Sequence, residues 1–168
     1  KGKTKTTMHA VSAAVMAKSA ATRGRRVLYI TYRKSLATAI FTELKSHNID
    51  NIVHYTEGIY SQAQKMTIGP FEPSFLDHAT VCVCQLESIG KVMHHAWDII
   101  ITDEVQGLSA QFDSPTMIKS NPAKTWNSLK QLYQTIPTAL FMDADFESWT
   151  IRAQDFVKTM RQKYTYVV

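Results

Sequence analysis

Short runs of apolar residues alternate along the chain with segments whose apolar residues recur at helical spacing. The run at residues 27–31 is almost continuously apolar, which is typical of a strand buried on both faces of a parallel sheet. Residues 35–46 instead place four apolar side chains on one helical face: Leu36, Ile40, Phe41 and Leu44. The whole pattern predicts strands at 27–31, 52–55, 80–84, 98–102, 138–142 and 164–168.

Helices are predicted between these strands, at residues 4–21, 35–46, 86–94, 122–134 and 147–162. Gly24 is placed to cap the first helix, and Asn121 followed by a proline marks the start of a later one. Residues 57–77 contain two glycines and two prolines, so we expect mostly loop there, with a short helix near 61–66. Alternating strands and helices predict an α/β fold with a mainly parallel sheet covered by helices on both faces.

Composition adds a basic bias to this picture. The chain has 168 residues, enough for one domain with a hydrophobic core, and a formal net charge of +5. Such a charge suits a polyanionic partner, although a solvated basic surface would give the same balance. Two cysteines exclude a disulfide-rich secreted scaffold, and Cys82 and Cys84 are expected to be small core residues. No apolar run approaches the roughly 20 residues of a membrane span.

The first residues carry the earliest sign of chemistry. Gly2, Lys3 and Thr4 match the end of the phosphate-loop pattern GxxxxGK[ST], in which the lysine reaches the phosphates and the Thr hydroxyl ligates Mg²⁺. Only Lys1 precedes Gly2, so we expect a fragment of a longer ATPase whose loop and preceding strand lie upstream. The tripeptide alone is common, and an ordinary basic helix start would explain it too.

Two acids follow the predicted strand at 98–102. Asp103 and Glu104 are expected at the edge of the sheet where ligands bind in open α/β folds. There Asp103 would hold Mg²⁺ through water and Glu104 would act as general base, although a simple strand-to-loop turn also accommodates acids. Together with Lys3 and Thr4, the pair favours ATP as the ligand. Asp143 and Asp145 follow another strand and either sense the 103–106 segment or form a turn.

Two further loops after strands carry groups that bind phosphate. Arg33, Lys34 and Ser35 combine two cations and a hydroxyl with a predicted helix start. Gln85 and Ser88 stand at another. Contacts to phosphate and sugar are favoured over base recognition, because only Tyr32 offers a stacking surface in these loops. Helix capping would explain Ser35 and Ser88 without a nucleic acid.

Segments 2–4, 27–36, 84–88, 103–105 and 142–145 resemble, in this order, motifs I, Ia, Ib, II and III of a superfamily 2 helicase. Their residues are similar to those of the herpesvirus-type replication origin-binding protein family, in which the sequence of motif II is Asp-Glu-Val and motif III contains Asp-Ala-Asp. Residues 112–117 fit that family as well. The resemblance implies the first RecA-like domain, a P-loop NTPase fold, of an ATP-dependent DNA helicase.

The resemblance also implies roles for individual residues. Those at the nucleotide would be Gly2, Lys3, Thr4 and Lys5, with Thr4 and Asp103 at Mg²⁺ and Lys3, Asp103 and Glu104 in catalysis. Those on the DNA backbone would be Arg33, Ser35, Gln85 and Ser88, and those coupling the two sites Gln106, Asp143 and Asp145. The partner would be single-stranded DNA during translocation and an origin duplex through regions not present, in the nucleus or a viral replication compartment.

The second RecA-like domain of such enzymes, with its arginine finger, is absent, so we expect this chain alone to be almost inert. A catalytically inert nucleic-acid-binding module is the main alternative to a motor. Intact Lys3, Thr4, Asp103 and Glu104 favour the motor over that module. A P-loop nucleotide kinase is the third reading, and it is weakened because no arginine-rich lid separates the loop from the acidic pair.

Overall fold

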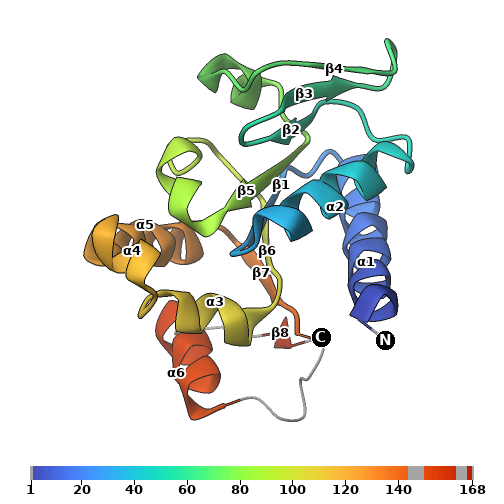
Figure 1. Ribbon diagram of the computed structural model, residues 1–168. Coiled ribbons are helices and arrows are strands. Elements are labelled where there is room, and N and C mark those ends of the chain that lie inside the picture. The colour runs from blue at the N-terminus through green and yellow to red at the C-terminus, as the bar shows by residue number, and fades with distance from the viewer. Residues whose placement is uncertain (1, 144–149, 162–165, 168) are drawn as a thin grey trace.

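The computed structural model describes residues 2–143, 150–161, 166 and 167, and it describes side chains for residues 11–143 and 150–161. Within these residues, 8 strands form one sheet in the order β4-β3-β2-β5-β1-β6-β7-β8 (Figure 1). Their bounds are β1 Val27–Thr31, β2 Ile52–His54, β3 Gly58–Ser61, β4 Met66–Ile68, β5 Val81–Gln85, β6 Ile99–Thr102, β7 Thr138–Phe141 and β8 Tyr166–Val167.

The centre of the sheet is parallel, as the apolar runs predict. β1 lies between β5 and β6 and pairs in parallel with both, so that Ile30 stands opposite Cys84 on one side and Thr102 on the other. All five residues of β1 are buried. Cys82 and Cys84 are buried with free thiols, as expected of core residues. β2, β7 and β8 extend the parallel part of the sheet.

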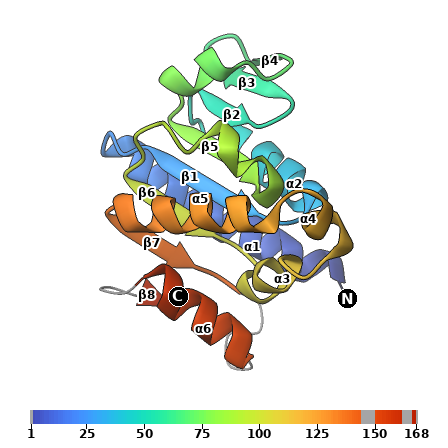
Figure 2. The ribbon, with the colours of Figure 1, turned by 90° about the vertical axis from the view of Figure 1, so that its left-hand side faces the viewer.

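Helices cover both faces of this sheet. α1 (Gly2–Thr22) and α2 (Lys34–Lys45) lie on one face, and α2 buries the four side chains predicted for its inner face. α3 (Val105–Gln111), α4 (Pro115–Lys119), α5 (Pro122–Thr135) and α6 (Ile151–Met160) lie on the other (Figure 2). A 3₁₀ helix, η2 (Leu86–Lys91), contacts α5. The prediction of a mainly parallel sheet between helical layers is therefore confirmed.

Two predicted helix ends are confirmed in detail. Gly24 adopts φ +70°, and the N–H of Arg25 reaches back to the carbonyl of Ala20 at 3.0 Å, which closes the end of α1. At the start of α5, the Asn121 side chain accepts a hydrogen bond of 3.1 Å from the N–H of Lys124. The local capping signals in the sequence thus set these boundaries correctly.

The prediction for residues 57–77 was wrong in part. The expected loop with a helix near 61–66 is instead an antiparallel hairpin, β3 and β4, followed by the 3₁₀ helix η1 (Pro73–Asp77). Gly58, at φ +120°, lies so close to β4 that a Cβ there would be 1.9 Å from the carbonyl oxygen of Ile68. Pairing of β3 with β2 overrides the local turn signals, because it buries Ile59 and Tyr60.

Other elements differ in length or were not predicted. α3 and α4 were missed, although Ser114 and Pro115 form an ordinary helix start in which the Ser114 side chain accepts from the N–H of Met117. The predicted helix at 86–94 is the shorter η2. α6 begins at Ile151, while residues 147–149, 162, 164, 165 and 168 of the predicted elements lie outside the described residues. Among the helices described, none combines the length and apolar character needed to cross a bilayer.

Candidate functional site

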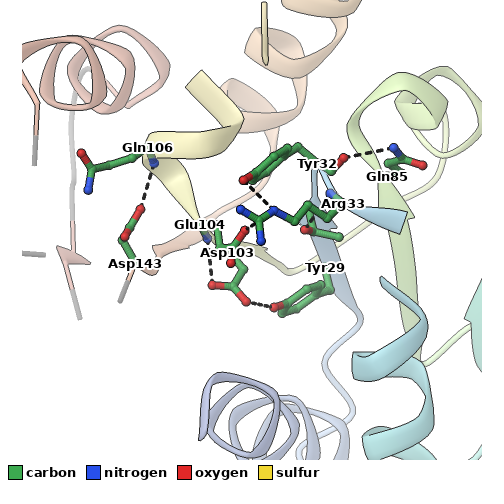
Figure 3. Close-up of polar contacts among 9 residues, drawn as sticks. Tyr29, Tyr32, Arg33, Gln85, Asp103, Glu104, Gln106 and Asp143 are labelled. Atoms are coloured by element: carbon green, nitrogen blue, oxygen red, sulfur yellow. Dashed lines mark hydrogen bonds and ion pairs between the residues drawn. The ribbon is translucent and has the colours of Figure 1, made fainter. Parts of the chain in front are cut away.

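Most of the predicted site residues meet at one edge of the sheet. β1, β5, β6 and β7 run parallel, so their carboxyl ends lie side by side. They deliver Arg33 after β1, Gln85 at the end of β5, Asp103 and Glu104 after β6, and Asp143 after β7 (Figure 3). Residues that are up to about a hundred positions apart in sequence are thereby gathered where open α/β sheets bind ligands.

Asp103 is fully buried and held from two directions. One carboxylate oxygen, Oδ1, accepts a hydrogen bond of 2.8 Å from the N–H of Glu104, and Oδ2 accepts one from the hydroxyl of Tyr29. Its own N–H donates to the carbonyl of Ile30 at 3.1 Å. These contacts fix the orientation of the carboxylate before any ligand arrives.

Tyr29 was not predicted as a site residue. It lies in β1 opposite Ile101, and its side chain is buried beneath Asp103. Burial, followed by the negative charge of Asp103, raises the pKa of Tyr29 well above its ordinary value, so the hydroxyl stays protonated and remains a donor. Its role depends on Asp103, which is 74 positions away, so no local pattern in the sequence identifies it.

Glu104 has an unusual backbone and a partly buried side chain. Its φ of 52° and ψ of 55° lie in the left-handed region, which costs a non-glycine residue about 1–2 kcal/mol, so its surroundings must hold it there. The side-chain Oε2 lies 3.3 Å from Nε of Arg33. Burial raises the pKa of the Glu104 carboxyl; the charge of Arg33 opposes this rise and that of Asp103 adds to it.

Tyr32 links three of the loops at this edge. Its hydroxyl accepts a hydrogen bond of 2.7 Å from Nε of Arg33, and its carbonyl accepts one of 3.0 Å from Nε2 of Gln85. Its ring lies against α3, where a Cβ on Gly107 would come within 2.3 Å of a ring carbon. Gly107 was not predicted as a site residue, because α3 itself was not predicted.

The residues predicted to bind nucleic acid differ in the exposure and hydrogen bonding of their side chains. Arg33 and Ser35 are exposed, whereas both ends of the Gln85 amide are engaged, because its Oε1 also accepts from the Tyr55 hydroxyl at 2.6 Å. Ser88 is half-buried within η2. Neither serine caps its helix: the N-cap positions are Arg33 for α2 and Gln85 for η2. The capping explanation for these two serines is therefore wrong.

Asp143 contacts the segment that it was expected to sense. Its Oδ2 accepts a hydrogen bond of 2.9 Å from the N–H of Gln106, and the N–H of Val105 donates to the carbonyl of Met142 at 3.2 Å. The side chain of Gln106 in turn accepts from the N–H of Thr150 at 3.2 Å. Asp145, the other acid predicted for coupling, lies outside the described residues. The structure thus ties the segments after β6 and β7 together.

The residues predicted to hold the nucleotide, Gly2, Lys3, Thr4 and Lys5, form the first turn of α1. The structure describes the backbone of these four residues but not their side chains. In both ribbon views the start of α1 lies at the same edge as the carboxyl ends of β6 and β7 (Figures 1 and 2). A helix start favours anions, and the carboxylates of Asp103 and Glu104 are the oxygen donors that Mg²⁺ prefers, so the arrangement fits Mg²⁺ with a nucleotide phosphate.

Metal ligation is incomplete among the side chains that are described. No group of three or more His, Cys, Asp or Glu side chains in that part of the chain is arranged to hold a metal ion. A magnesium site at this edge would have to combine Asp103 with the Thr4 hydroxyl and the nucleotide itself. This is the usual way in which Mg²⁺ is held, through one or two protein groups plus substrate phosphates.

Comparison with known proteins identifies the family. A family model described as origin of replication binding protein, of the herpesvirus type, matches residues 1–165. Comparisons with curated proteins and with solved structures give no significant match. The match covers nearly the whole chain, including every predicted motif, and the family's description makes DNA the partner and replication the process. The chain belongs to the family of origin of replication binding proteins.

Proposed function

We propose that the chain is the nucleotide-binding lobe of an ATP-dependent DNA helicase that acts at replication origins. The observation that carries the proposal is the position of Asp103 and Glu104 at the carboxyl edge of the sheet, the edge at which α1 starts, with Glu104 in contact with Arg33. Family membership supplies DNA as the partner. To family membership the proposal adds the helicase activity, the P-loop fold and the cofactors ATP and Mg²⁺.

At the nucleotide, each residue has a separate role that follows from the chemistry of its side chain. Lys3 places a positive charge at the phosphates, and the Thr4 hydroxyl and the Asp103 carboxylate provide oxygen ligands for Mg²⁺. Bound Mg·ATP supplies the phosphoanhydride bond and the neutralisation of charge on it. Tyr29 and the N–H of Glu104 keep the Asp103 carboxylate in one orientation, so little reorganisation is needed when the ion binds.

Glu104 is the proposed general base. Its partly buried carboxyl has a raised pKa, which strengthens it as a proton acceptor for an attacking water. Asp143 and Met142 hold the N–H groups of Gln106 and Val105, so a shift of the segment after β6 is passed to the segment after β7. We assign Gln106 and Asp143 to coupling nucleotide state to movement, together with Asp145 from the predicted motif.

At the nucleic acid, exposed groups after β1 are suited to phosphate. Arg33, Lys34 and Ser35 are all exposed around the start of α2. Ser88 and Gln85 would contribute from the neighbouring loop, with Gln85 positioning Tyr32 as well. We propose that the strand is single-stranded DNA during translocation, and that the protein works in the nucleus or a viral replication compartment, where its DNA is copied.

Nucleotide binding is the first test of this function. Equilibrium binding of a fluorescent ATP analogue is measured with and without Mg²⁺, for the full-length protein and for Lys3→Ala. Loss of a charge-assisted phosphate contact of about 1.5–3 kcal/mol would weaken binding by about tenfold or more. Lys18→Ala, an exposed lysine on the same helix, is the matched control and should leave affinity unchanged. No Mg²⁺-dependent binding, or equal affinities for the two lysine variants, would refute the assignment.

A further inference from the structure

Arg33 stands between the two proposed sites. The order β5-β1-β6 in the sheet places the loop after β1 between the Gln85–Ser88 loop and the Asp103–Glu104 pair. Registers of the parallel strands bring the three loops to the same level, because Ile30 is opposite both Cys84 and Thr102. A single side chain after β1 can therefore reach either neighbour.

The Arg33 guanidinium is only partly engaged in hydrogen bonds. Nε donates to the Tyr32 hydroxyl at 2.7 Å and lies 3.3 Å from Oε2 of Glu104, and the group packs over the Tyr32 ring with 5.1 Å to the centroid. Within the described residues, neither Nη atom forms a hydrogen bond. The side chain remains 57% exposed. Figure 3 shows the guanidinium beside Glu104 and Tyr32. Because the side chain is largely exposed and its Nη atoms form no hydrogen bond, its fork of N–H groups is available to recognise phosphate.

Glu104 is held by this contact only loosely. Its Oε2 is buried but accepts no hydrogen bond from Arg33, since the Nε–H of Arg33 is directed to Tyr32. The attraction between Arg33 and Glu104 is therefore an ion pair without a hydrogen bond. Ion pairs with an exposed partner are weak, so a competing anion of higher charge density can displace this one.

We propose that Arg33 is shared, pairing with Glu104 when no nucleic acid is bound and turning to a backbone phosphate when a strand enters. This inference rests on the proposed function and adds to it the link between the two sites. Binding of the strand frees the Glu104 carboxylate to orient a water, and Glu104 in turn competes with the strand for Arg33. The two effects are reciprocal and equal in free energy, so measuring either one measures the coupling.

A thermodynamic cycle on DNA affinity tests the sharing without requiring hydrolysis. The full-length protein, Glu104→Gln, Arg33→Gln and the double variant are titrated into a fluorescent oligothymidylate, without nucleotide, and anisotropy is recorded. Glu104→Gln removes the competitor, so it should tighten binding by about two- to fivefold, the range expected for a weak surface ion pair. In the Arg33→Gln background the same change should have no effect. Thermal unfolding of each variant establishes that all four are folded.

Glu87→Gln is the control for a general change of charge. Glu87 lies in η2 beside Ser88 and accepts from Gln111 at 3.1 Å, and it forms no ion pair with Arg33 among the described residues. Its removal should change affinity equally with and without Arg33. Unchanged affinity in Glu104→Gln, or tightening that persists without Arg33, would overturn the sharing while leaving the proposed function intact. Absence of any binding by the unmodified protein would instead overturn the DNA-binding part of the proposed function, and the inference with it.

Discussion

The Tyr29 hydroxyl donates a hydrogen bond to the Asp103 carboxylate, and both side chains are buried beneath the carboxyl edge of the sheet. The bond joins the central strand β1 to the residue proposed to ligate Mg²⁺. Since Asp103 also accepts the N–H of Glu104, its carboxylate connects Tyr29 to the backbone of the second acid. A buried carboxylate needs such donors, because an ion in the interior without hydrogen bonds is costly.

Tyr29→Phe should therefore destabilise the fold. It keeps the ring but removes a hydrogen bond to a charged group, which corresponds to about 1.5–3 kcal/mol of unfolding free energy, measured by urea titration. Tyr133→Phe is the matched control, because Tyr133 is equally buried and its hydroxyl bonds the neutral Thr102. That variant should lose only about 0.5–1.5 kcal/mol. Equal losses in the two variants would contradict a special role for the Tyr29–Asp103 pair.

Gly107→Ala should also be costly, against the usual helix preference for alanine. The new Cβ would lie 2.3 Å from the Tyr32 ring, so the ring must shift and the Arg33–Tyr32 bond must stretch. Overpacking of this kind costs about 1–3 kcal/mol, and weaker DNA binding should accompany it. Gly90→Ala is the control, since its Cβ would meet nothing within 4 Å. Urea unfolding that finds Gly107→Ala as stable as Gly90→Ala would show that Tyr32 does not rest on α3.

His54 should make stability depend on pH. It is fully buried between the rings of Phe41 and Tyr55, and its Nδ1 accepts the N–H groups of Thr56 and Glu57, both at 3.3 Å. No hydrogen-bond partner for Nε2 exists among the residues described. Burial lowers the pKa of His54 below 6.5; Glu57 opposes this shift, and two lysines, Lys45 and Lys34, add to it.

The sign of the effect follows from which state binds the proton. Below pH 6.5 the unfolded chain protonates His54 while the folded protein still excludes the proton, so the unfolding free energy falls as pH falls. Above about pH 6.5 this contribution is constant. Urea titrations from pH 5 to 8 should show the slope, and His54→Asn, which keeps an acceptor but cannot titrate, should flatten it. A slope unchanged in His54→Asn would assign the pH dependence to other groups.

Elements could be predicted from the sequence where the local pattern of apolar residues agrees with their burial in the structure. β1 and α2 were predicted because their apolar residues match the strand and helix periods that the core requires. The acidic pair was located because parallel strands bring their carboxyl ends to one edge, a rule that needs no coordinates. The capping signals at Gly24 and Asn121 succeeded for the same reason: they act within one turn of the chain.

Features that depend on distant partners could not be predicted. The β3–β4 hairpin forms because β2 offers an edge for pairing, which Gly58 and Gly69 do not reveal. The roles of Tyr29, Tyr32 and Gly107 come from contacts across 74 positions or from close packing between elements. Gln85 was interpreted as a DNA ligand from its place in a motif, yet its amide also donates a hydrogen bond to the carbonyl of Tyr32.

Hydrolysis of ATP by the full-length protein, with and without single-stranded DNA, is the direct test of the proposed ATPase site. We expect turnover that requires Mg²⁺, rises with DNA and falls by about 10²–10⁴-fold in Glu104→Gln, as for the loss of a general base. Glu87→Gln, measured in parallel, should keep its turnover. DNA binding without hydrolysis, or full activity in Glu104→Gln, would contradict the assignment of this edge of the sheet as an ATPase site.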